Sequence, residues 1–131
     1  FDIDWRELHP GDRASIGDLT LEALGVQHDE RLSATLGFNA ELAGRKFAYT
    51  GDSGLCDAVF DMARHAEVLI SECASLSDRL PIHMNLVDDI PAVRRAMKPD
   101  AQLILTHIDT GTTAEGLERT LVASDLATYR F

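Results

Sequence analysis

The chain has 131 residues, of which 45% are hydrophobic and 26% are charged, a balance typical of one soluble domain or part of one. The formal net charge of −10 argues against a broad nucleic-acid-binding surface, because phosphate backbones attract lysine and arginine. The sequence shows no long apolar run and no basic, apolar leader, so we expect no membrane segment, no signal peptide and a cytoplasmic location.

The first half of the chain is predicted to be rich in β-strands, because apolar residues alternate between clusters of turn-forming residues. Strands are expected over residues 1–8, 19–24, 26–28, 33–42 and 47–49. The turn residues at 9–12 and 43–46 separate members of this series. A hairpin is therefore expected around 43–46.

The second half alternates between short apolar runs and helical periodicity. Helices are predicted over residues 55–65, 86–97 and 113–122, and strands over 68–70, 102–106 and 126–131. Pro91 lies inside the second helical pattern, so either Asp88 or Asp89 caps that helix, or an earlier start is kinked. The order predicts an α/β (α+β) fold with one sheet and helices on one face, which leaves the other face in need of a cover.

Polar residues follow four of the predicted strands, where a rigid scaffold meets an open loop. They are His28, Asp52, Glu72 and His107. Asp52 stands between two glycines that let the backbone turn sharply and let a ligand approach, although it could instead cap the next helix. His107 follows a buried strand and could bind a metal ion or serve as a structural hydrogen-bonding residue.

Five short motifs contain these residues, and their order and spacing resemble those of the metallo-β-lactamase-fold hydrolases. The motifs are VQH (26–28), YTGDSG (49–54), LISECA (69–74), HMN (83–85) and LTH (105–107). The resemblance covers nearly the whole chain and is greatest to the ribonuclease Z-like and phosphodiesterase-like branches. It implies that residues 1–131 form one partial domain, the C-terminal half of a four-layer αββα sandwich with one mixed sheet.

The resemblance also implies metal-binding roles for three residues. His28 would bind the first of two metal ions, His107 the second, and Asp52 would bridge both. A carboxylate can span two ions about 3.5–4 Å apart, and neutral imidazoles add ligands without adding charge. Two Zn²⁺ ions are expected as cofactors, with Mn²⁺ or Fe as alternatives.

Glu72 and His83 resemble a catalytic pair of the ribonuclease Z-like branch, in which the glutamate orients a histidine that helps to protonate the leaving group. The alternative is a solvated Glu72 and a partly exposed loop histidine at His83. The chain departs from that branch at Ser71, where a histidine often precedes the glutamate. The short interval between His28 and Asp52 leaves no room for a tRNA-clamping arm, so tRNA is not expected as a substrate.

The His-x-His-x-Asp-His cluster that supplies most ligands in the family does not occur in this sequence. Together with Phe1 in first place, this predicts a fragment or a natural half-domain. An uncovered sheet face would then pair with the other half or with a second copy.

We expect a metal-dependent hydrolase that is active only when complete. A metal-bound hydroxide would attack a small-molecule phosphodiester or, less favoured, a lactone, thioester or sulfate ester. The alternative is a non-catalytic half-domain or interaction module that lacks a competent metal site.

The remaining candidates are expected to be structural. Cys56 and Cys73 form no CxxC pair and are predicted to be small core residues in a reducing compartment. Activity that depends on their thiols is a weaker hypothesis. His9 and His65 are predicted to be structural or surface residues.

Overall fold

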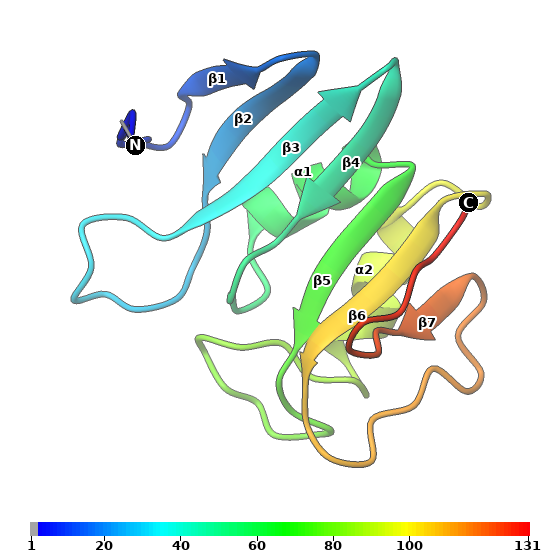
Figure 1. Cartoon of the computed structure of the whole chain (residues 1–131). Helices are drawn as coiled ribbons and strands as arrows, with labels where there is room; N and C mark the ends of the chain where they lie inside the picture. The colour runs from blue at the N-terminus through cyan, green and yellow to red at the C-terminus, as the bar shows by residue number, and fades with distance from the viewer. Residues whose placement is uncertain (1–2) are drawn as a thin grey trace.

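A computed structural model describes residues 3–131 and shows one seven-stranded sheet with two helices in that part of the chain (Figure 1). The elements are β1 (Arg13–Ile16), β2 (Leu19–Gly25), β3 (Leu36–Leu42), β4 (Arg45–Tyr49), α1 (Asp57–His65), β5 (Val68–Cys73), α2 (Asp89–Ala96), β6 (Gln102–Ile108) and β7 (Thr120–Val122). Neighbours in the sheet are neighbours in the chain. Pairing is antiparallel from β1 to β4 and parallel from β4 to β7, so the predicted mixed sheet is confirmed.

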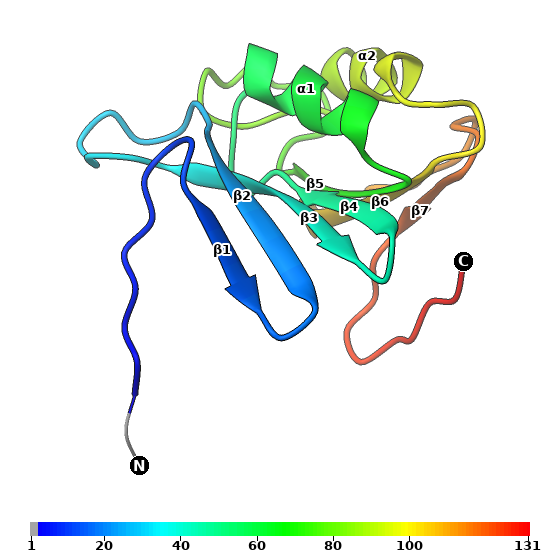
Figure 2. The ribbon, with the colours of Figure 1, turned by 90° about the horizontal axis from the view of Figure 1, so that it is seen from above.

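Both helices lie on one face of the sheet, as Figure 2 shows. Helix α1 connects β4 to β5 and α2 connects β5 to β6, which are the crossovers that parallel neighbours require. Their apolar sides bury Val59, Met62 and Val93 in one core with Leu69 and Leu103 of the sheet. Neither helix of the described part is long and apolar enough to cross a membrane.

The opposite face of the sheet is largely bare. Neither helix covers it (Figure 2). An open hollow there is lined by Leu19, Leu21, Phe38, Ala40, Leu42, Phe47, Ala48, Tyr49 and Ile70. Leu42 and Tyr49 are 44% and 42% exposed. The expectation that helices cover only one face is therefore confirmed.

Helix α2 begins at Asp89 with Asp88 in the N-cap position, so Pro91 lies in the first turn, where its missing N–H has no helical partner to lose. This confirms the uninterrupted helix and removes the kinked alternative. Asp88 makes no capping hydrogen bond with its side chain.

The prediction of a helix over residues 113–122 is wrong. Residues 120–122 form β7, which pairs in parallel with β6, and the preceding residues form a loop. Gly116 and Arg119 both have positive φ, a conformation that interrupts a right-handed helix. The backbone N–H of Leu103 donates to the carbonyl of Arg119, so pairing with a buried strand outweighs a weak local helical pattern.

Four strand predictions are also corrected. Residues 126–131 form no strand, and Leu126 has a positive φ of 61°. Residues 3–8 are not a strand either, and the rest of that prediction, residues 1–2, lies outside the described residues. Strand β2 ends at Gly25, so residues 26–28 lead into a loop that rejoins the sheet at Leu36 rather than at residue 33.

Candidate functional site

Three histidine side chains gather at one end of the sheet. The ring of His83 lies between the other two, with centroid distances of 4.9 Å to His28 and 5.4 Å to His107. Strands β2, β4, β5 and β6 point in the same direction. The loops that follow them therefore meet at one edge, the usual place for ligand sites in such sheets.

A bulge in β6 sets the place of His107. Glu72 pairs with Thr106 and Cys73 with Ile108, so His107 is the extra residue between two ladder positions. Its φ is 46°. Bulges of this kind redirect a side chain and occur next to active sites.

Asp52 reaches this cluster from the loop between β4 and α1. Its Oδ1 lies 3.7 Å from Nδ1 of His107, and both side chains are about half exposed. The neighbouring Gly51 has a φ of 61°, and a Cβ there would lie 2.7 Å from the carbonyl oxygen of Leu36, so only glycine suits this turn. Helix α1 has Cys56 in its N-cap position, so the alternative in which Asp52 caps it is wrong.

Glu72 is buried at the end of β5 and is not the solvated glutamate of the alternative. Its Oε1 accepts hydrogen bonds from Nδ1 of His83 at 3.0 Å, from the backbone N–H of Ser53 at 3.0 Å and from that of Met84 at 3.2 Å. Its Oε2 accepts from the backbone N–H of Ala74 at 2.8 Å. The carboxylate is thus satisfied by four donors.

The partners of two histidines define their tautomers. Nδ1 of His28 lies 3.0 Å from the carbonyl oxygen of Ile82. A carbonyl can only accept, so Nδ1 carries the hydrogen and the neutral ring keeps its lone pair on Nε2. Oε1 of Glu72 also accepts two backbone N–H groups, so in its contact with this oxygen Nδ1 of His83 is the donor and carries the hydrogen. The side chain of His83 is 18% exposed, so it is the partly exposed loop histidine of the alternative, although its partner Glu72 is buried.

The cluster offers donor atoms that suit zinc, but these atoms do not form a complete metal site. His28, Asp52 and His107 supply two imidazoles and one carboxylate in one region, whereas a structural zinc ion takes four ligands. Within residues 3–131, no group of three or more His, Cys, Asp or Glu side chains is placed to hold a metal ion. The described residues alone therefore do not fit the two ions, and the metal-binding and catalytic roles of the five named residues stay predictions.

The cysteines take the structural places that were predicted for them. Cys73 is buried in the core, and Cys56 packs against that core. Burial and the neighbouring Glu72 carboxylate raise the pKa of the Cys73 thiol to about 12, so the nucleophilic thiolate is suppressed. His9 is exposed near Asp12.

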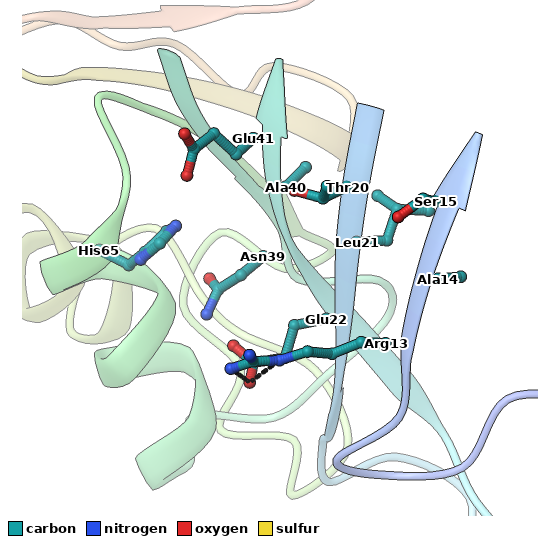
Figure 3. A pocket seen from close by; sticks show the side chains of 10 residues that line it. All are labelled: Arg13, Ala14, Ser15, Thr20, Leu21, Glu22, Asn39, Ala40, Glu41 and His65. Atoms are coloured by element: carbon teal, nitrogen blue, oxygen red, sulfur yellow. Dashed lines mark hydrogen bonds and ion pairs between the residues drawn. The ribbon is translucent and has the colours of Figure 1, made fainter. Parts of the chain in front are cut away.

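His65 lines a separate hollow beside the end of α1 (Figure 3). Burial, followed by the positive charge of Lys46, lowers its pKa. Arg13 and Glu22 form an ion pair at 2.8 Å across β1 and β2. Oδ1 of Asn39 is buried here without a hydrogen-bond partner among the described residues, which is a destabilising feature that sequence reasoning did not identify.

The comparisons with known proteins agree with this fold. The family described as "Beta-lactamase superfamily domain" matches residues 1–108. The uncharacterized protein Rv1339 of Mycobacterium tuberculosis is 28% identical over 118 residues, which cover 88% of this chain and 41% of that protein. Ribonuclease Z of Salinispora arenicola is 35% identical over 72 residues, or 53% of this chain and 23% of that enzyme.

Among solved structures, the isothiocyanate hydrolase from Delia radicum gut bacteria superposes with a TM-score of 0.72 at 20% identity, over 96% of this chain and 59% of that one. This chain spans less than half the length of the two curated relatives named above, Rv1339 and ribonuclease Z. The resemblance drawn from the five motifs is confirmed. The chain belongs to the metallo-β-lactamase superfamily and corresponds to about half of that fold.

Proposed function

We propose that this chain serves in a metal-dependent hydrolase of phosphodiester bonds, to which it supplies His28, Asp52 and His107 as metal ligands. The observation that carries the proposal is the meeting of three histidines and Asp52 at one sheet edge. The partial likeness to a ribonuclease supports a phosphodiester as the substrate class.

When bound, two zinc ions (or Mn²⁺ or Fe) would supply Lewis acidity and lower the pKa of a water nucleophile. The remaining ligands would come from outside this chain. His28 presents the lone pair of Nε2, because its Nδ1 is engaged with Ile82. Asp52 presents a partly exposed carboxylate with two oxygens.

His83 is proposed as the group that, when both of its ring nitrogens carry a proton, gives the Nε2 proton to the leaving oxygen. Its Nδ1 is held by the buried carboxylate of Glu72, so Nε2 is the nitrogen that faces other partners. Glu72 would act as a positioning residue, since its own oxygens are occupied by four donors.

The test uses the complete protein and bis(p-nitrophenyl) phosphate. Asp52→Ala is expected to lower kcat/KM by more than about 100-fold, more than the loss of an outer-shell partner causes. Asp100→Ala is the matched control, because Asp100 is an exposed aspartate outside the cluster, and it should keep full activity. Unchanged hydrolysis in Asp52→Ala would overturn the proposal.

The rival function is a non-catalytic interaction module, which the incomplete donor set favours. It predicts no metal in the purified complete protein and no hydrolysis of phosphodiesters, lactones, thioesters or sulfate esters. Hydrolysis of one of the other esters, with loss of that activity in Asp52→Ala, would support a metal-dependent hydrolase. The proposed substrate class would then change from phosphodiesters to that ester.

A further inference from the structure

The backbone of Gly54 lies so close to that of Pro81 that no side chain fits between them. A Cβ on Gly54 would lie 2.1 Å from the carbonyl oxygen of Pro81 and 2.9 Å from its carbonyl carbon. Gly54 has no positive φ, so the glycine is required by this contact and not by its own backbone conformation. The loop after β4 and the loop after β5 are thus in direct contact.

Gln27 connects these two loops to a third. Its backbone carbonyl accepts a hydrogen bond from the N–H of Gly54 at 2.8 Å, and its side-chain Nε2 donates to the carbonyl of Pro81 at 3.0 Å. Gln27 belongs to the loop after β2. One residue therefore ties the other two loops together through its backbone and its side chain.

The next residues along the chain belong to the histidine cluster. His28 follows Gln27 and bonds to the carbonyl oxygen of Ile82 through Nδ1. His83 follows Ile82 and bonds to Glu72 through Nδ1. The position of residues 81–83 therefore decides both the tautomer of His28 and the place of the His83 ring.

We propose that Gly54 and Gln27 are positioning residues that hold residues 81–83 against the loop after β2. By this contact, one loop carries the candidate proton donor and also keeps the lone pair of His28 on Nε2. The inference rests on the proposed function, which gives His83 its role as proton donor and His28 its role as metal ligand. The tautomers and ring positions of the two histidines can be measured even in a protein that shows no hydrolysis.

The experiment records long-range ¹H–¹⁵N spectra of the histidine rings in the complete protein, stripped of metal with EDTA at pH 8, where an ordinary imidazole is neutral. In the wild type, His28 and His83 should both show a protonated Nδ1. Gly54→Ala should move His28 toward a mixture of tautomers and shift the ring signals of His83, whereas those of His65 stay in place.

Two controls separate positioning from a general loss of structure. Gly25→Ala is matched to Gly54→Ala, because Gly25 also lacks a positive φ and its Cβ would meet only the ring of Pro10 at 3.2 Å. Its spectrum should be that of the wild type. If Gly54→Ala does not fold, Gln27→Met removes the donor without steric conflict, and Gln27→Lys restores a donor on a similar stem.

We expect Gln27→Met to change the His28 tautomer and to weaken zinc affinity about 10- to 100-fold, the range for outer-shell partners of a metal site. Gln27→Lys should recover most of both. Wild-type tautomers in Gly54→Ala, or in Gln27→Met where the former does not fold, would overturn the inference whatever the activity. Altered tautomers in a protein without phosphodiesterase activity would support the inference while the proposed function fails.

Discussion

Nδ1 of His83 lies 3.0 Å from Oε1 of Glu72, and the same oxygen accepts the backbone N–H groups of Ser53 and Met84. One buried carboxylate therefore joins the loop after β4 to the loop after β5. Its side chain is 1% exposed, so water cannot replace a lost partner. A buried acceptor of this kind contributes both to folding and to the orientation of the imidazole.

Glu72→Gln should lower the free energy of unfolding by about 2–4 kcal/mol, because an amide replaces one acceptor oxygen with a donor that faces an N–H group. Urea denaturation of wild type and variant measures the difference. Glu67→Gln is the control, since Glu67 forms a partly exposed pair with Arg45 and should change stability by less than about 0.5 kcal/mol. Equal effects of the two substitutions would contradict this account of Glu72.

The bare face of the sheet should cause the 131-residue chain, produced alone, to associate. Leu42 and Tyr49 border the apolar hollow and are partly exposed, and apolar surfaces of this kind promote association. Tyr49→Lys should shift the sedimentation coefficient toward that of a monomer. Val87→Lys, a change at an exposed apolar residue outside the hollow, should not. A monomeric wild-type chain at micromolar concentration would count against the prediction.

The thiol of Cys73 should resist modification, and it should make the stability of the fold fall at alkaline pH. Its pKa rises from 9.0 to about 12 in the folded chain, so the folded state holds the proton more tightly than the unfolded state. The contribution to stability is complete below pH 9 and is lost as the pH rises from 9 toward 12. Denaturation at pH 8 and pH 10.5 should show a smaller alkaline loss for Cys73→Ala than for wild type. Identical losses would refute the assignment.

Asn39 should stabilise the fold no better than an apolar residue of similar size. Its Oδ1 is buried and without a partner among the described residues, and such an acceptor costs about 1–3 kcal/mol. Asn39→Leu should therefore leave the free energy of unfolding unchanged or raise it by about 1 kcal/mol, as measured in urea. A decrease of more than about 1 kcal/mol would show that the Asn39 amide makes a stabilising contact.

The elements around the core could be predicted from the sequence because their signals are local. The apolar run over Val68–Cys73 and the spacing of Val59 and Met62 specify a buried strand and a helix without reference to distant residues. Strand β7 could not be predicted in this way. It exists because Thr120–Val122 pair with β6, and that long-range pairing outweighs the local helical pattern.

The members of the candidate site could be named from their motifs, but their contacts could not. The contact between Gly54 and Pro81 depends on the approach of two loops that are distant in the chain. The bulge that displaces His107 depends on the register of β5 and β6. Neither feature has a local sequence signal, so the roles inferred for Gln27 and Gly54 required the structure.

Whether His28, Asp52 and His107 bind metal is tested by the metal content of the complete protein, measured by mass spectrometry after purification with zinc and removal of free ions. About two ions per chain are expected in the wild type and in Asp100→Ala, as in other two-metal sites. Asp52→Ala should lose at least one ion. An unchanged metal content in Asp52→Ala, and in His28→Gln and His107→Gln as well, would contradict the assignment of these residues to a metal site.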